Sequence, residues 1–210
     1  YLPELYKIIL LQNSEFLKDA YNEQQQINRK RARPKVLLAT NYTDAIEIYS
    51  QYKKNLLGVI SDVGLILNQG DRAENEKLDA GIDICKMIKT ETPWMPVILQ
   101  SSQENYNAVA EQMGVGFISK SSKTLLTELQ DVILREFGFG EFVFRNHETG
   151  AEVGRARDLM QMQDLIAPVP DDVLEFHLSQ MKLSKWLYSR GLFPLANVLR
   201  NINSSHFSSI

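Results

Sequence analysis

Three hydrophobic stretches of the chain each end in a side chain that suits phosphoryl transfer. The first stretch ends at the carboxylate of Asp62, the second at the hydroxyl of Ser101 and the third at the ammonium group of Lys120. A carboxylate oxygen can attack a phosphoryl donor in line and form an acyl phosphate. A nearby ammonium group and a hydroxyl donor stabilise the charge that spreads over the equatorial oxygens. We expect Lys120 to pair with Asp62 at rest and with the phosphoryl group afterwards.

The three groups meet only if the stretches before them are neighbouring parallel strands. Residues 56–60, 97–99 and 117–118 are short apolar runs, which are typical of strands covered on both faces. Helical patterns alternate with these runs, so we expect parallel strands joined by right-handed crossovers. Ligands gather at the carboxyl edge of such a sheet. The sequence therefore predicts an α/β fold with a doubly wound parallel sheet and the three groups at one edge.

The remaining elements of this region follow from the same periodicities. A fourth apolar run, Val36–Ala39, is expected to be a buried strand. Residues 64–80 are polar and rich in turn formers, so we expect a mobile, disordered loop there. Four segments show apolar residues at helical spacing, namely 43–52, 82–88, 104–113 and 123–137.

The parts on either side of this region are expected to be mostly helical. Residues 2–27 show one long amphipathic pattern, and the basic run Arg29–Arg33 follows it. After an extended piece at 141–144 and a turn at 147–150, helices are predicted at 152–166, 171–190 and 192–202. The predicted organisation is a long N-terminal helix with a basic connector at 1–33, an α/β domain at 34–140, a helical extension at 141–202 and a disordered tail at 203–210.

The composition argues against several classes of protein. The net charge of −3 over 210 residues gives no sign of nucleic-acid binding, and no stretch is long and apolar enough to suggest a membrane span. The single cysteine, Cys85, fits a reducing compartment, so we expect a cytoplasmic location. The chain begins at Tyr1 inside an amphipathic pattern and without a signal peptide, so we expect it to be cut from a longer protein. His177 has no second His or Cys at ligand spacing, so we expect it to be structural.

Residues 34–137 resemble the receiver domain of two-component response regulators. The resemblance rests on four motifs, which are Ile60-Ser61-Asp62-Val63, Gln100-Ser101-Ser102, Phe117-Ile118-Ser119-Lys120 and Gly81-Ile82-Asp83-Ile84-Cys85. It implies a flavodoxin-like fold in which Asp62 is the phospho-acceptor and Ser101 and Lys120 contact the phosphoryl group. It also implies that Phe117 is a switch aromatic residue, which moves into the space that Ser101 leaves. The implied function is phosphorelay signal transduction, with a sensor kinase or another phosphodonor as partner.

The chain departs from this family at the metal site. Receivers hold Mg²⁺ with the acceptor carboxylate and with an acidic pair that follows their first strand. Val36–Ala39 corresponds better to the second strand of the family, so we expect the first strand and its acidic pair upstream of Tyr1. Only Asp62 and the backbone carbonyl of Gly64 then remain as ligands, so Mg²⁺ is expected in the intact receiver and binds weakly or not at all here. Without that central strand, we expect an altered sheet or a strand from another chain.

A second resemblance concerns the C-terminal part of the chain. Segments 137–144 and 183–200 are similar to regions of large pyruvate, phosphate dikinase-like or phosphoenolpyruvate synthase-like proteins of Bacteroidetes-type bacteria. In those proteins a receiver-like region precedes the phosphotransfer domains. The resemblance implies that this chain regulates such attached domains and is not itself catalytic. The parent protein would be an ATP-dependent phosphotransferase, and a homodimer stays an open alternative.

Two other functions stay open at this point. A flavodoxin-like enzyme that binds a cofactor would need a phosphate loop, and neither of the usual glycine-rich motifs is present in the sequence. A purely structural pseudo-receiver would use Asp62 and Lys120 only as an ion pair.

Overall fold

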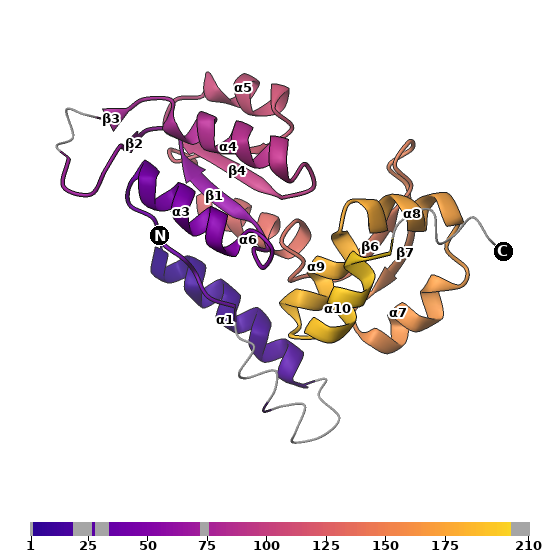
Figure 1. Cartoon of the computed structure of the whole chain (residues 1–210). Coiled ribbons are helices and arrows are strands. Elements are labelled where there is room, and N and C mark those ends of the chain that lie inside the picture. Colours follow the sequence, from indigo (N-terminus) through magenta and orange to yellow (C-terminus); the bar gives the residue numbers. More distant parts are fainter. Residues whose placement is uncertain (1, 19–26, 28–33, 72–75, 203–210) are drawn as a thin grey trace. The chain divides into compact units, whose positions relative to one another are not determined.

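The structure is a computed structural model, and it describes residues 2–18, 27, 34–71 and 76–202 (Figure 1). The chain divides into two compact units. We call Lys35–Leu129 the sheet unit, and Tyr1–Pro34 together with Gln130–Ile210 the hairpin unit. The predicted basic connector, the predicted tail and most of the second half of the predicted N-terminal helix lie outside the described residues. Within the described ranges, no helix has the length and apolar character that crossing a membrane requires.

A small parallel sheet lies at the centre of the sheet unit. It consists of β1 (Val59–Asp62), β4 (Val97–Ser101) and β5 (Gly116–Ser119), in the order β1-β4-β5. Both pairs are parallel, with Val59 opposite Val97 and Ile98 opposite Gly116. Each strand overlaps an apolar run of the sequence, so the prediction of a mixed α/β fold with a parallel sheet is confirmed.

Helices cover this sheet and complete its core. They are α3 (Tyr42–Tyr52), α4 (Ala80–Glu91), α5 (Tyr106–Gln112) and α6 (Leu125–Arg135), the last of which begins in the sheet unit and continues beyond it. The side chain of Asn41 caps α3 by accepting a hydrogen bond of 2.8 Å from the backbone N–H of Asp44. Leu99, Ile88 and Cys85 are fully buried in the core. Burial raises the pKa of the Cys85 thiol to about 12, so this cysteine is not an activated nucleophile.

The prediction of a buried strand at Val36–Ala39 is wrong. This run forms no strand, and its residues Leu37 and Leu38 are 42% and 61% exposed. The described sheet ends at β1, whose neighbour is β4. An apolar run becomes a strand only where a neighbouring strand satisfies its backbone groups, and Val36–Ala39 has no such neighbour in the described sheet. The sheet is therefore smaller than the α/β pattern alone predicted.

The prediction that residues 64–80 form only a loop is also wrong for the described part. β2 (Leu65–Ile66) and β3 (Glu76–Lys77) pair antiparallel in a short ribbon. The backbone N–H of Thr43 donates to the carbonyl oxygen of Leu67 at 3.1 Å, which ties the ribbon to the start of α3. Lys77 forms an ion pair with Asp83 on α4. These contacts position the ribbon against two helices.

The described part of the hairpin unit contains helices and one antiparallel pair of strands. Its described elements are α1 (Leu2–Lys18), β6 (Phe142–Arg145), β7 (Glu152–Ala156), α7 (Leu159–Ile166), α8 (Asp171–Ser179), α9 (Lys182–Ser189) and α10 (Phe193–Arg200). The predicted single helix over 171–190 is broken at Met181, whose φ is 54°. Phe144, Trp186 and Leu187 are almost fully buried in a core that the hairpin shares with the C-terminal helices.

The prediction of a helix over 152–166 is wrong for its first part. Residues 152–156 pair with β6, and Phe142 lies opposite Ala156. The side chain of Asn146 accepts hydrogen bonds from the backbone N–H groups of Glu148 and Thr149 at 3.0 and 2.9 Å, which forms the turn. The turn returns the chain alongside β6, and strand pairing overrides the helical pattern. The extension at 141–202 is therefore a hairpin followed by helices.

Candidate functional site

The structure places Asp62 and Lys120 together at the end of the parallel sheet. Oδ2 of Asp62 lies 2.9 Å from Nζ of Lys120, and both side chains are 41% exposed. Asp62 is the last residue of β1, and Lys120 follows the last residue of β5. An ion pair with this exposure contributes only about 0–1 kcal/mol to stability. Either group can therefore change partners at little cost.

The strand order explains why two residues far apart in sequence meet. β4 lies between β1 and β5, and it bonds to the residues that follow both of them. The backbone N–H of Val63 donates to the carbonyl oxygen of Gln100 at 3.1 Å, and the N–H of Lys120 donates to that of Ser101 at 2.8 Å. The carboxyl ends of the three strands thus share one edge, where ligands of parallel sheets gather.

Ser101 lies at this edge, and its hydroxyl already has a local partner. Its Oγ accepts a hydrogen bond of 3.1 Å from the backbone N–H of Gln103, and the residue is half-buried. This bond stabilises the turn between β4 and α5. A hydroxyl can still donate its own hydrogen while it accepts one, so Ser101 keeps a donor for a ligand at this edge.

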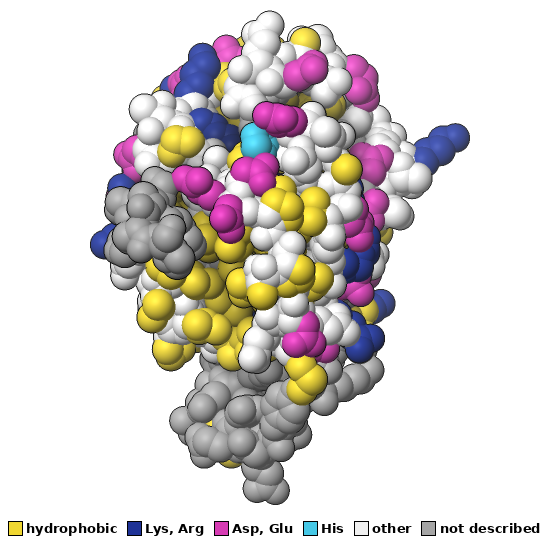
Figure 2. Space-filling view, turned by 90° about the vertical axis from the view of Figure 1, so that its right-hand side faces the viewer, with side chains coloured by type: hydrophobic (Ala, Val, Ile, Leu, Met, Phe, Trp, Pro, Cys, Tyr) yellow, Lys and Arg dark blue, Asp and Glu magenta, His cyan; other side chains and the backbone are white. Residues whose placement is uncertain are grey.

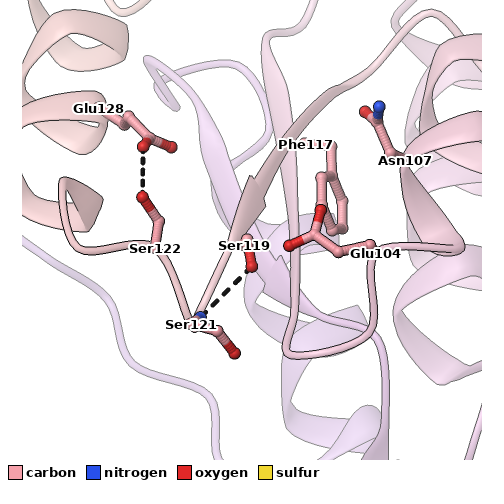
Figure 3. A pocket seen from close by; sticks show the side chains of 7 residues that line it. All are labelled: Glu104, Asn107, Phe117, Ser119, Ser121, Ser122 and Glu128. Atoms are coloured by element: carbon pink, nitrogen blue, oxygen red, sulfur yellow. Dashed lines mark hydrogen bonds between the residues drawn. The ribbon is translucent and has the colours of Figure 1, made fainter.

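Phe117 lies on β5 and contributes to a neighbouring surface depression (Figure 3). Its ring is half-buried and packs against the core of the sheet unit. The depression has a volume of about 440 Å³ and a largely polar lining. Its lining residues are Glu104, Asn107, Phe117, Ser119, Ser121, Ser122 and Glu128. Asp62 and Lys120 are not among them, but Ser119 and Ser121, on either side of Lys120, are.

Apart from Ser119, the polar residues of this depression belong to none of the sequence motifs described above. They come from the start of α5, the end of β5 and the start of α6, and each is an ordinary surface residue in its own segment. One signal was available, because Phe117 and Ser119 alternate along β5 and so share a face. The side chain of Glu128 accepts hydrogen bonds from the hydroxyls of Ser122 and Thr124, and these bonds lower the pKa of its carboxyl.

Gly81 fixes the position of the backbone that carries Asp62. Its N–H donates to the carbonyl oxygen of Val63 at 2.7 Å. A Cβ atom at Gly81 would overlap the carbonyl oxygen of Asp62. The first turn of α4 therefore packs directly against the end of β1, and only glycine permits this approach. This contact gives a physical reason for a glycine that the sequence analysis noted only through a resemblance.

Replacing Gly81 with alanine is expected to lower the free energy of unfolding by about 1–3 kcal/mol, because the added methyl group must push α4 away from β1. Urea denaturation followed by circular dichroism measures the loss. Gly154→Ala is the matched control, because its Cβ would meet only the end of the flexible Leu165 side chain, at 2.9 Å. Equal losses for the two variants would contradict the close approach at Gly81.

The edge offers few ligands for a metal ion. Gly64, whose carbonyl was expected to bind Mg²⁺ with Asp62, lies in the turn between β1 and β2. Across the ranges that the structure describes, no group of three or more His, Cys, Asp or Glu side chains could hold a metal ion. Mg²⁺ requires near-octahedral coordination by oxygen, and a single carboxylate supplies only part of such a set.

No family model matches this chain, and no curated protein or solved structure is significantly similar to it. The class that the fold defines is a mixed α/β protein with a small parallel sheet.

Proposed function

We propose that the sheet unit is a receiver-type signalling module with a flavodoxin-like fold, in which Asp62 is the phospho-acceptor. The observation that carries this proposal is the 2.9 Å contact between Asp62 and Lys120 at the carboxyl edge of three parallel strands. Ser101 supplies a hydroxyl at the same edge. A carboxylate, an ammonium group and a hydroxyl in this arrangement support transfer of a phosphoryl group to the carboxylate.

The proposed reaction needs only these side chains and a metal ion. An Asp62 carboxylate oxygen forms a bond to phosphorus while the bond from phosphorus to the leaving oxygen of the donor breaks, so acetyl phosphate releases acetate. Lys120 then exchanges its ion pair with Asp62 for one with a phosphoryl oxygen. The half-exposed pair permits this exchange, because it is weak in water. A bound Mg²⁺ would neutralise charge on the donor.

We propose further that the module is degenerate as it stands and acts by contact. With only Asp62 and the carbonyl oxygen of Gly64 as ligands, Mg²⁺ would bind weakly and would limit phosphorylation. In a longer protein it would regulate attached phosphoenolpyruvate or pyruvate phosphotransfer domains, in response to a sensor kinase or another phosphodonor. A structural pseudo-receiver is the second candidate, and the bond from the N–H of Gln103 to the Ser101 hydroxyl favours it, because that hydroxyl already stabilises a turn.

Labelling with acetyl phosphate at increasing Mg²⁺ concentrations tests the proposal. We expect weak labelling at low Mg²⁺ and a steady rise as the concentration increases, because mass action fills a weak metal site. The gain of one phosphoryl group is measured by intact mass spectrometry, and peptide mapping locates it. Asp62→Asn should abolish the label, and Lys120→Ala should reduce it strongly. Lys123→Ala, at an exposed lysine three residues further on, is the matched control and should leave labelling unchanged.

Two outcomes would contradict parts of this proposal. Absence of any Mg²⁺-dependent label on Asp62 at the highest Mg²⁺ concentration would leave the structural pseudo-receiver as the better assignment. Full labelling at low Mg²⁺ would keep the receiver chemistry and contradict the statement that the metal site is weak.

A further inference from the structure

The surface depression beside β5 combines one aromatic ring with several hydrogen-bond acceptors (Figure 3). Its volume of about 440 Å³ lies in the range of sites for small organic ligands. The ring is that of Phe117, and the polar side chains of the lining are Glu104, Asn107, Ser119, Ser121, Ser122 and Glu128. All of these residues belong to the sheet unit, so the depression lies within one compact unit.

The lining of the depression carries negative charge and no positive charge. Glu104 and Glu128 are its two acidic residues, and it contains no lysine, arginine or histidine. Nζ of Lys120, the nearest cation in sequence to Ser119 and Ser121, lies 2.9 Å from a carboxylate oxygen of Asp62. Lys123 is exposed and does not belong to the lining. The ion pairs found among the described residues include neither glutamate, so the depression attracts a cation.

The polar groups of the lining are positioned to accept hydrogen bonds from a ligand. The hydroxyls of Ser122 and Thr124 donate to Oε1 of Glu128, and these bonds lower the pKa of its carboxyl. Because both bonds end on Oε1, Oε2 remains an acceptor for a ligand. Oγ of Ser119 accepts a bond of 3.3 Å from the backbone N–H of Ser121, and a hydroxyl oxygen can accept a second one. An ionised carboxylate has no hydrogen to donate, so this lining suits a ligand that is rich in donors.

We propose that the depression binds a guanidinium group. This group is planar, always charged and has five N–H donors and no acceptor. Its plane stacks on an aromatic ring such as that of Phe117, and its edges donate to carboxylates. Glu104 precedes α5 and Glu128 lies on α6, and Figure 3 shows them on either side of the end of β5 that carries Ser119. Binding here does not depend on the chemistry proposed for Asp62.

The lining disfavours other classes of ligand. Phosphates and nucleic acids are anions, which the two carboxylates repel. A metal ion needs more ligands, since the part of the chain that the structure describes brings no three suitable side chains together. Figure 2 shows hydrophobic side chains gathered on one face of the molecule, whereas this lining is mostly polar, and an apolar ligand would leave its polar groups without partners. An ammonium group lacks the plane that stacks on a ring and is more strongly hydrated.

Titration of the full chain with methylguanidinium, followed through its backbone amide resonances, tests the proposal. We expect saturable shifts at residues 119–122. Glu104→Gln, Glu128→Gln and Phe117→Leu should each raise the Kd about fivefold or more, because each removes a charge or the ring from the lining. Glu111→Gln, at an exposed carboxylate of α5 outside the lining, is the matched control and should leave the Kd unchanged. Circular dichroism verifies that every variant folds.

Two further probes define what is recognised and where it comes from. Methylurea has a similar planar shape without the charge, so it should bind at least about tenfold more weakly than methylguanidinium. A free small molecule and an arginine side chain of a partner protein present the same group. Tighter binding of a capped glycine–arginine–glycine peptide than of methylguanidinium would identify the side chain as the source, and equal or weaker binding would identify the free molecule.

Three results would overturn the proposal. One is binding of methylurea as tight as that of methylguanidinium, since the depression would then be a site for neutral polar molecules. Another is an equal effect of Glu111→Gln and Glu128→Gln, which would mean that the cation associates with acidic surface in general. The third is the absence of saturable shifts at residues 119–122.

Discussion

Replacing Trp186 with alanine is expected to lower the free energy of unfolding of the hairpin unit by about 3–5 kcal/mol. The indole is 1% exposed and lies in the core that the hairpin shares with the C-terminal helices. Its Nε1–H donates to the carbonyl oxygen of Gly140 at 3.0 Å, and the guanidinium carbon of Arg190 lies 3.8 Å from its ring centroid. Alanine would leave a large cavity and remove both of these polar contacts.

The effect is large because Trp186 helps to hold the segment between α6 and β6. Arg190, which stacks on the indole, donates hydrogen bonds to the carbonyl oxygens of Gly138 at 2.9 Å and Gly140 at 2.8 Å. Gly138 has a φ of 82°, and a Cβ atom there would lie 3.1 Å from the backbone of Trp186. The loop and α9 therefore meet backbone to backbone, with Trp186 and Arg190 filling the space around the contact.

Urea denaturation of three variants separates the parts of this effect. Trp186→Phe keeps an aromatic ring and loses the hydrogen bond to Gly140, so it should cost less than Trp186→Ala. Phe193→Ala, at a ring that is 37% exposed, is the matched surface control. Trp94 lies in the sheet unit, so its fluorescence reports separately whether that unit is affected. A loss for Trp186→Ala no larger than the loss for Phe193→Ala would contradict the assignment of Trp186 to the core.

The sequence predicts a strand of this sheet reliably in two cases. One is a strand with a neighbour on each side, and the other is a strand that ends at a residue with a distinct chemical role. Val97–Ser101 is buried along nearly all its length, and an apolar run reports that burial directly. Val36–Ala39 is an equally apolar run, but a strand also needs a neighbouring edge, which no local pattern records. The run therefore lies exposed, and the sheet ends at β1.

The prediction for the hairpin is wrong in the opposite sense, because a segment predicted as a helix forms a strand. Residues 152–156 were assigned to a helix because the apolar residues after them recur at helical spacing. The correct signal lies upstream, in the alternation of Phe142, Val143 and Phe144 and in the turn that Asn146 begins. A turn of that length returns the chain as a second strand, and Phe144 is then buried by pairing rather than by a helix.

Some features of the candidate site could be predicted from the sequence, and others could not. Asp62 and Lys120 could be brought together from strand order alone, because the ends of parallel strands share an edge. The backbone contact between Gly81 and Asp62 depends on how closely α4 approaches β1, which the sequence does not encode locally. The depression beside Phe117 collects residues from three segments, so it becomes visible only in three dimensions.

Lowering the pH from about 6.5 to about 4 is expected to reduce the free energy of unfolding of the hairpin unit by about 3 kcal/mol through His177 alone. The imidazole is 3% exposed. Burial lowers its pKa to about 4 from an ordinary 6.5, and the positive charge of Lys182 adds to this effect. The unfolded chain therefore takes up the proton first as the pH falls. Stability contributed by the neutral ring is fully present above pH 6.5 and is lost as the pH approaches 4.

The geometry around His177 explains why the neutral ring is required. Its Nε2 lies 3.0 Å from the backbone nitrogen of Arg145, whose N–H it can accept, and 3.2 Å from the Arg145 carbonyl oxygen, to which a protonated Nε2 would donate. The charged ring carries a proton on both nitrogens, so Nε2 can no longer accept from the Arg145 N–H, and the rings of Phe142 and Phe144 that pack against it cannot solvate the charge.

The difference between two variants isolates this contribution from that of the carboxylates, which titrate over the same range. His177→Gln removes the titrating ring, so its free energy of unfolding should fall less steeply between pH 6.5 and pH 4 than that of the wild type. His147→Gln is the matched control, because His147 is exposed and stacks on Phe176 with a centroid distance of 4.9 Å. The control should follow the wild-type curve. If the curves of the wild type and His177→Gln run parallel, protonation of His177 does not cause the loss of stability at low pH.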